Sequence, residues 1–254
     1  MSDLQALVFI CAMVFLGGFI DAIAGGGGLI TLPAYLLTGI PVHFAYGANK
    51  LTGSAGTTFA ALKYFRCGAL DLKPALISAA GAFAGSALGA KSALYLDEQV
   101  LKSAVSLFLP FVAVFLILHK NKGEKNLSGQ LTMKRRAILA LLIGFAMGFY
   151  DGILGPGTGT FAIIAYNALM KYDLKTASGN AKVLNLASNY AACFTFILAG
   201  TVEYRLAVPA MIFAVAGNLL GASLAIRKGS RFIRPVMVLV IFLLLGKMLL
   251  DLFV

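Results

Sequence analysis

The sequence predicts an all-α, polytopic integral membrane protein made of two inverted repeats. Its composition gives the first reason: 60% of the 254 residues are hydrophobic and 12% are charged, with a mean hydropathy of +0.90, which leaves too little polar material to cover a soluble globule. The second reason is a series of apolar stretches near bilayer-spanning length, and the third is a glycine-broken apolar helix that occurs twice. We expect one membrane domain over residues 1–254 and no separate soluble domain.

The glycine-broken helix recurs at a nearly fixed offset. In each copy an apolar segment runs into an aspartate, a group of glycines and a second apolar segment. An offset of 130 residues superimposes three positions of the two copies, namely Asp21 on Asp151, Gly25 on Gly155 and Gly27 on Gly157. Further along, an offset of 132 superimposes five more, namely Lys50 on Lys182, Gly68 on Gly200, Asp71 on Glu203, Gly85 on Gly217 and Gly89 on Gly221. We therefore predict repeats over 4–119 and 134–252, joined by a basic loop over 120–133.

The first half is expected to hold a long helix, a short helix and three further long helices. The long helix over 4–23 ends at the glycine run, because glycine loses the most backbone entropy on ordering. The segment 29–40 then offers about 12 helical positions, roughly 18 Å of helix against a hydrocarbon core of about 30 Å, so it should span only part of the bilayer. Polar and basic residues separate the three helices that follow, at 45–65, 74–95 and 99–119.

The second half repeats this order after the loop that joins the halves. That loop carries Asn, Gly and Ser residues, which favour turns. The expected helices are 135–154, a short one over 159–170, then 176–200, 206–226 and 232–252. The whole chain thus contains about eight long helices and two short ones, each short one directly after a glycine break.

The distribution of Lys and Arg among the loops predicts the topology. Three loops carry most of these residues, 63–73, 119–136 and 227–234, and such loops are normally cytoplasmic. All three lie on one side if each broken unit enters and leaves on the same face and three full crossings follow it. Each repeat then crosses an odd number of times, so the halves are inverted relative to each other, as in many secondary transporters. Both termini would lie outside.

The two glycine breaks are the expected centre of the substrate site. Irregular backbone at membrane depth must be buried in protein or line a water-filled cavity, so equivalent breaks of an inverted repeat should meet near the midplane. The unpaired N–H groups at the helix starts, at Gly28 and at Thr158, carry partial positive charge and could cradle an anion. The alternative is that the glycines only permit close packing.

Four charged residues lie within otherwise apolar segments. Asp21 and Asp151 are costly there, and such carboxylates mark a pathway, a proton relay or an ion pair. They could carry a coupled proton, or they could pair with a lysine or cap a loop N–H. Lys50 and Lys182 stand early in their helices, where snorkelling to the headgroups is the alternative to a role in the site.

Each lysine begins a polar stripe along its helix. Asn185 and Asn189 follow Lys182 at i+3 and i+7, and Gly53 and Thr57 follow Lys50 at the same spacing. We interpret these stripes as faces that contact substrate, with hydrogen bonding between helices as the alternative. The residues expected to form the substrate site are Gly25, Gly26, Gly27, Gly28, Asn49, Lys50, Thr57, Gly155, Gly157, Thr158, Lys182, Asn185 and Asn189.

Several other functions find no support in the sequence. The formal charge of +11 sits in short loops between spans, so it indicates topology and not nucleic-acid binding. Cys11, Cys67 and Cys193 lack the spacing of a metal site, and two scattered histidines form no metal cluster. Neither glycine run matches a phosphate-binding motif. We expect no cofactor, no bound metal and no enzymatic activity.

The four-residue spacing of Gly81, Gly85 and Gly89 favours close helix packing and could also serve a homodimer.

The chain also resembles a known family at these residues. The motifs that carry the resemblance span nearly the whole chain: Gly18-Phe19-Ile20-Asp21 with Gly25 to Gly28, Asn49-Lys50-Leu51, Gly148-Phe149-Tyr150-Asp151 with Gly155-Pro156, Ala181-Lys182 with Leu184-Asn185 and Ser188-Asn189, and Lys228-Gly229 with Ile233-Arg234-Pro235. They are similar to those of the TauE/SafE sulfite exporter family, also called the toluene sulfonate uptake permease family, and within it to the YfcA-type branch.

The resemblance implies a multi-pass carrier in a bacterial inner membrane. It implies a small organosulfur anion as substrate, such as sulfite, sulfoacetate or another sulfonate, usually moved in the export direction. We therefore expect a secondary transporter with alternating access about a midplane site, coupled to a proton or to Na⁺. A passive anion channel and a non-transporting membrane scaffold are the alternatives.

Overall fold

The structure is a computed structural model that describes residues 3–97, 99–100 and 125–253. These residues form helices joined by short loops and contain no strand, which confirms the all-α prediction. The helices are α1 (Asp3–Ala24), α2 (Gly28–Leu37), α3 (Val42–Arg66), α4 (Leu72–Tyr95), the 3₁₀ helix η1 (Ser128–Gln130), α6 (Met133–Ile153), α7 (Thr158–Met170), α8 (Leu174–Leu198), α9 (Tyr204–Lys228) and α10 (Ser230–Phe253).

The predicted helices match the observed ones closely wherever the chain is described. The two short helices are present, each directly after a glycine break, as α2 with 10 residues and α7 with 13. The predicted helix over 99–119 lies almost entirely outside the described residues. Within the predicted loop between the halves, the described part holds the short helix η1.

Four of the described helices, α1, α6, α8 and α9, are long and apolar enough to cross a membrane. Helix α3 has a comparable length of 25 residues but a more polar sequence. Its polar side chains Lys50, Thr52, Ser54 and Thr57 are buried inside the protein. The polarity of α3 therefore belongs to the interior, which accords with a bundle whose outer surface is apolar.

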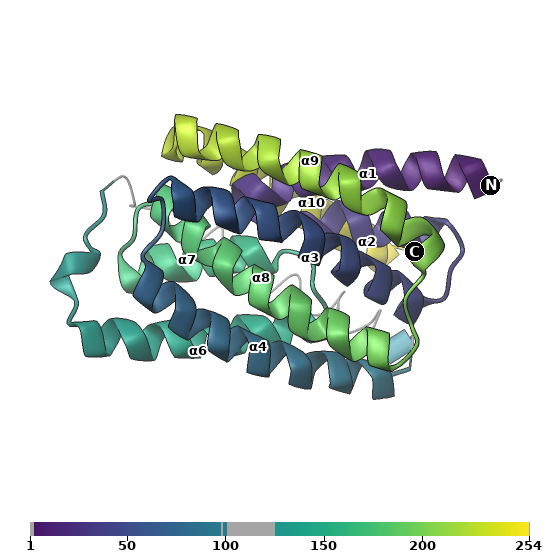
Figure 1. The fold of residues 1–254 in the computed structure, drawn as a ribbon, viewed down its shortest axis with the longest axis horizontal. Coiled ribbons are helices and arrows are strands. Elements are labelled where there is room, and N and C mark those ends of the chain that lie inside the picture. The colour runs from purple at the N-terminus through teal and green to yellow at the C-terminus, as the bar shows by residue number, and fades with distance from the viewer. Residues whose placement is uncertain (1–2, 98, 101–124, 254) are drawn as a thin grey trace.

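The two halves of the chain interlock. Helix α1 packs on α9, and its counterpart in the second half, α6, packs on α4. In the same way α3 lies against α9 and α8 lies against α4, while α3 and α8 contact each other. In Figure 1, α1 and α3 run from right to left whereas α6 and α8 run from left to right. These opposite directions accord with the predicted inverted repeat.

Glycines allow two of these helix pairs to approach until their backbones touch. On α4, a Cβ atom at Gly85 would overlap the carbonyl oxygen of Phe145 on α6, and one at Gly89 would overlap that of Phe149. On α9, a Cβ at Gly217 would overlap the carbonyl of Phe15 on α1. The glycine rows thus serve helix packing inside the chain, as their spacing predicts.

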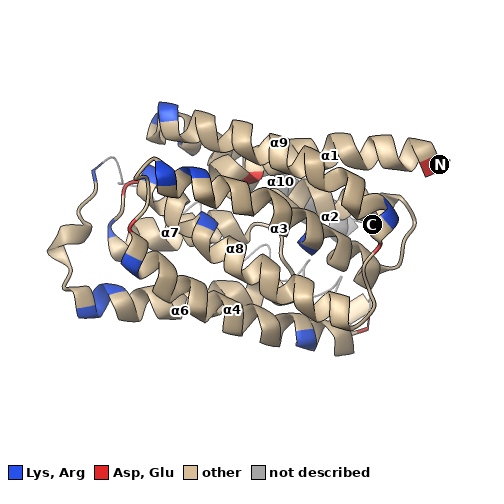
Figure 2. Ribbon diagram, in the orientation of Figure 1, with Lys and Arg blue, Asp and Glu red and all other residues tan. Residues whose placement is uncertain are grey.

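Most of the described basic loop residues lie at one end of the bundle (Figure 2). Lys63, near the end of α3, donates to Ser223 near the end of α9. Arg136, near the start of α6, pairs with Asp71, just before α4, with 2.5 Å between Nη1 and Oδ2. The end of α3, the end of α9, the start of α4 and the start of α6 therefore share this end. That it faces the cytoplasm stays a prediction.

Candidate functional site

Two buried ion pairs join the halves of the protein. The Nζ atom of Lys50 on α3 lies 2.7 Å from Oδ2 of Asp151 on α6. The Nζ atom of Lys182 on α8 lies 2.6 Å from Oδ2 of Asp21 on α1. Each lysine of one repeat thus holds the aspartate of the other, because Lys50 corresponds to Lys182 and Asp21 to Asp151.

Burial excludes the snorkelling alternative for both lysines. Lys50 is 1% exposed and Lys182 is fully buried. A charge held this deep is costly and persists only when it is paired and hydrogen-bonded. In the structure each of the two carboxylates is the ion-pair partner of a lysine, whereas their part in coupling stays a prediction.

The two glycine breaks lie against each other inside the bundle. A Cβ atom on Gly159, at the start of α7, would stand only 2.5 Å from Cα of Gly25, the first residue of the first break. The hydroxyl of Thr160 donates to the carbonyl oxygen of Ala24 at 2.7 Å and so ties α7 to the last residue of α1. Gly25 and Gly155 both have left-handed backbones, with φ of 80° and 87°, which glycine adopts at no steric cost.

A cavity of about 50 Å³ lies beside the crossing breaks. A cavity needs roughly 10–15 Å³ of such volume to hold one water molecule, so this one has room for several waters or a small ion. The predicted residues that line it are Asp21, Gly25, Gly27, Gly28, Asn49, Lys50, Asp151, Gly155, Thr158, Asn185 and Asn189. The structure thus brings most of the predicted site together around one space.

Four predicted residues do not line this cavity. Gly26 faces Val240 of α10, where a Cβ would stand 2.5 Å from the valine Cγ atoms. The hydroxyl of Thr57 donates to the carbonyl of Gly53 on its own helix at 2.7 Å. Lys182 is not part of the cavity wall, although it pairs with Asp21, which is. Gly157 ends the second break and precedes α7, but is not part of the cavity wall.

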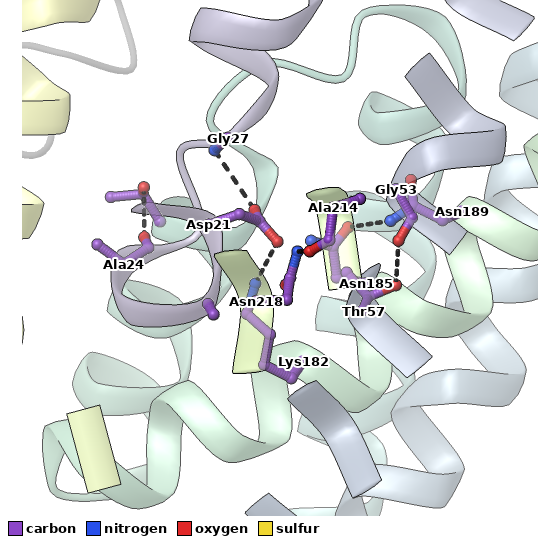
Figure 3. A network of polar contacts seen from close by, with 12 residues as sticks. Asp21, Ala24, Gly27, Gly53, Thr57, Lys182, Asn185, Asn189, Ala214 and Asn218 are labelled. Carbon is purple, nitrogen blue, oxygen red and sulfur yellow. Dashed lines mark hydrogen bonds and ion pairs between the residues drawn. The ribbon is translucent and has the colours of Figure 1, made fainter. Parts of the chain in front are cut away.

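The polar network around Asp21 connects the break to the stripe of α8 (Figure 3). One carboxylate oxygen of Asp21 accepts from Lys182, and the other lies 3.4 Å from the backbone N of Gly27. On α8, the amide of Asn189 donates to Oδ1 of Asn185 at 3.2 Å. The two asparagines therefore present a linked pair of amides to the cavity that Asp21 also borders.

Three polar residues of the cavity wall escaped the sequence reasoning. Thr31 donates to Oδ1 of Asn49 at 2.5 Å, Thr52 donates to the carbonyl of Ala48 at 3.1 Å, and Asn218 donates to the carbonyl of Ala214 at 2.9 Å. Of the three, Asn218 could have been recognised from the sequence, because it is an amide within the apolar sequence of α9. Among the described residues, no group of His, Cys, Asp and Glu is arranged to hold a metal ion.

Comparison with known proteins places the chain in a family. The family model described as "Sulfite exporter TauE/SafE" matches residues 10–248. A protein of Haemophilus influenzae named "Probable membrane transporter protein" is 34% identical over 98% of this chain and 96% of its own length. "Probable membrane transporter protein ORF9" of Sinorhizobium is 35% identical over 99% of this chain and 96% of its own length. "Probable membrane transporter protein YfcA" of Escherichia coli K12 is 33% identical over 98% and 90%.

No solved structure gives a significant match. The family match covers nearly all of the two predicted repeats, both glycine breaks and all four residues of the buried ion pairs. The resemblance read from the sequence motifs is therefore confirmed. The chain belongs to the TauE/SafE sulfite exporter family.

Proposed function

We propose that this protein is a secondary transporter that moves a small anion through the cavity at the crossing of the two helix breaks. The observation that carries the proposal is the pair of buried Lys–Asp bridges at that cavity, Lys50 with Asp151 and Lys182 with Asp21. Ionisable residues inside a membrane protein mark substrate or ion pathways. The names of the relatives, all membrane transporters, support the same class of function.

Anion recognition follows from the donors around the cavity. The ammonium of Lys50 supplies a positive charge at the wall, and the amides of Asn185 and Asn189 can donate to anion oxygens. The starts of α2 and α7, at Gly28 and Thr158, line the cavity and add the positive ends of two helix dipoles. Such a set suits a compact oxyanion, and family membership favours a sulfite or sulfonate group, exported across a bacterial inner membrane.

The interlocked halves suggest how access could alternate. Each ion pair links one predicted repeat to the other. A rocking motion between the repeats would therefore have to move or break the pairs Lys50–Asp151 and Lys182–Asp21. Transporters built from inverted repeats commonly expose a central site to each side in turn by such a motion. A channel would share the hydrogen-bond donors around the cavity but would not need the repeats to move. A scaffold would need neither the donors nor the movement.

Ligand binding to the purified protein tests the site directly. A panel of sulfite, sulfoacetate, taurine, thiosulfate, sulfate, acetate and methanesulfonate is screened by thermal shift in detergent, where a bound ligand raises the unfolding midpoint. We expect a sulfonate or sulfite to raise the midpoint of the wild type and of the control Lys91→Ala, whose side chain is exposed. The same ligand should have little effect on Asn185→Ala. A shift produced by none of the anions, or only by taurine, which is a zwitterion without net charge, would remove the anion-site proposal.

Transport in sealed proteoliposomes separates the remaining alternatives. A secondary transporter should accumulate the labelled anion above its outside concentration when an ion gradient is imposed. A channel would bring the two concentrations only to electrochemical equilibrium, and a scaffold would move nothing. Loss of accumulation in Asn185→Ala, with folding retained, would connect the activity to this cavity.

A further inference from the structure

The two buried ion pairs differ in how firmly their carboxylates are held. Asp151 accepts from Lys50 at 2.7 Å and from the hydroxyl of Ser188 at 2.7 Å, and its side chain is 4% exposed. Asp21 accepts from Lys182 at 2.6 Å, but its other contact, with the N of Gly27, is 3.4 Å long, and its side chain is 14% exposed. Both contacts of Asp151 are made by its Oδ2 atom, whereas those of Asp21 are divided between Oδ2 and Oδ1. Asp21 is therefore the more exposed carboxylate, and its second hydrogen bond is the longer and weaker one.

The sequence explains this difference between otherwise equivalent positions. Ser188 has Gly56 as its counterpart 132 residues earlier, so no hydroxyl is available at that place to bind Asp21. Ser86, which donates to the carbonyl of Ser188 at 2.7 Å, has Asn218 as its counterpart. Asn218 fills the space beside Gly56, and its buried Oδ1 atom has no hydrogen-bond partner among the described residues.

With both aspartates ionised, the charges around the cavity sum to zero and do not favour the binding of an anion. Asp21, Lys50 and Asp151 line the cavity, whereas Lys182 pairs with Asp21 without lining the cavity itself. Even with Lys182 counted, two lysines are matched by two aspartates, and the site is neutral before any ligand enters. An anion would add an unbalanced charge in a desolvated space and would meet the Asp21 carboxylate across the cavity.

We propose that Asp21 takes up one proton when the anion binds, so that one proton crosses the membrane with each anion. The proton comes from the water on the side from which the anion enters and leaves with it on the other side. Once protonated, Asp21 no longer repels the anion and gains an O–H that can donate to it. Lys182 then keeps its charge without an anionic partner, and this charge balances the ligand. The inference rests on the proposed function.

The groups around Asp21 on the packed helices support this assignment. Lys182 comes from α8, Lys50 from α3 and Asp151 from α6, and the Oδ2 atom of Asp151 accepts short hydrogen bonds from both Lys50 and Ser188. The hydroxyl of Tyr64 on α3 is occupied by the carbonyl oxygen of Ala22 at 3.0 Å. Helices α2, α7 and α9 contribute Thr31, Thr158 and Asn218 to the cavity, none of which titrates, and the described side chains of α10 add no titratable group to its wall. Asp21 is thus the more exposed of the two carboxylates at the cavity and the one that accepts a single short hydrogen bond.

Binding of methanesulfonate to the purified protein tests the proposal. This sulfonate stays ionised at all ordinary pH values, unlike sulfite, so any dependence of its affinity on pH reports a group of the protein. Between about pH 5 and pH 8 we expect the wild-type affinity to weaken by up to tenfold for each unit of rising pH, as linkage requires when one proton binds with the ligand. A pH indicator in weakly buffered solution should show uptake approaching one proton per anion bound.

Two variants locate the proton. In Asp21→Asn the affinity for methanesulfonate should no longer depend on pH and proton uptake should disappear. In the matched variant Asp151→Asn the pH slope and the uptake should both remain, whatever the affinity. Equal loss of the slope in both variants would reject Asp21 as the specific carrier.

The wild-type measurements decide the question even if Asp21→Asn does not fold. Binding with a flat pH dependence and no proton uptake would overturn the inference and leave the anion site standing. Absence of methanesulfonate binding at every pH, together with absence of a thermal shift by any anion of the panel, would overturn the proposed function and this inference with it.

Discussion

At the residue scale, the two buried Lys–Asp pairs are the places where loss of one side chain should destabilise the protein most. Removing the charge of Lys50 alone leaves Asp151 buried and unpaired, which costs about 3–5 kcal/mol when one member of a buried pair is lost. We therefore expect Lys50→Met to lower the thermal midpoint strongly. The double variant Lys50→Met with Asp151→Asn should recover most of this loss, because no uncompensated charge remains and Ser188 can still donate to the amide oxygen.

The thermal midpoints of the two single variants and the double variant, measured in one detergent, give the coupling between the residues. If the double variant is as unstable as the sum of the singles, Lys50 and Asp151 do not form the pair described. Transport should stay absent in the double variant, because the positive charge at the cavity wall is gone.

A second residue-scale prediction separates backbone strain from close packing at the glycine breaks. Gly25 and Gly39 have nearly the same left-handed φ, 80° and 83°, but only Gly25 lies against another backbone, that of Gly159. Gly39→Ala should cost on the order of 1–2 kcal/mol, the usual penalty of a left-handed alanine. Gly25→Ala should cost clearly more, or prevent folding, because the added methyl group overlaps α7. Equal thermal midpoints for the two variants would show that the contact between Gly25 and Gly159 leaves space for a methyl group, against the close packing described.

The four buried charges could be picked out from the sequence, but their pairing could not. Asp21, Asp151, Lys50 and Lys182 stand out because each is a charge in an apolar segment, and in the structure they form the two ion pairs, of which all members but Lys182 line the cavity. That each lysine reaches the aspartate of the other repeat depends on how the halves interlock, which no local pattern encodes. Thr31 and Thr52 escaped notice because threonine inside a helix usually bonds its own backbone and gives no sign of a cavity.

At the element scale, the glycine rows set the distance between helices. Gly85 on α4 meets the backbone of α6, whereas its neighbour Ala84 is exposed on the outer face of α4. We expect Gly85→Val to force α4 and α6 apart, to reduce the amount of folded protein and to lower the thermal midpoint by several degrees or more. Ala84→Val adds a side chain of the same kind towards lipid and should leave the midpoint nearly unchanged. Size-exclusion profiles and thermal midpoints of the two variants give the comparison.

Helix positions could be predicted well because apolar runs, glycine and charged loops mark where helices begin and end. The largest differences concern α2 and α3. The predicted helix over 29–40 is observed as Gly28–Leu37, and the predicted helix over 45–65 is observed as Val42–Arg66. Here the short connection from Thr38 to Pro41 has only one polar side chain and gives little contrast with the apolar helix ends on either side. Gly39, with its left-handed φ, ends the turn after α2 and could have been recognised as a helix stop.

At the scale of the whole molecule, the halves are joined at the site itself and not only along their surfaces. The ion pairs, the contact of Gly25 with Gly159 and the hydrogen bond from Thr160 to Ala24 all connect one repeat to the other. A ligand in the cavity therefore touches both repeats at once. This is the arrangement in which binding energy can shift the balance between two relative positions of the repeats.

The orientation of the molecule in the membrane can be tested with its own cysteines. Cys67 is exposed just after α3, at the end of the bundle where Lys63 and Arg136 also lie, whereas Cys11 and Cys193 are buried. If the basic loops are cytoplasmic, a membrane-impermeant maleimide should leave Cys67 unlabelled in intact cells and should label it in inverted membrane vesicles. The variant Cys67→Ser with Asp97→Cys moves the one exposed thiol to the far end of α4 and should reverse this result. Labelling of Cys67 from outside would place the basic loops on the outer face and reverse the predicted topology, while leaving the fold and the cavity unchanged.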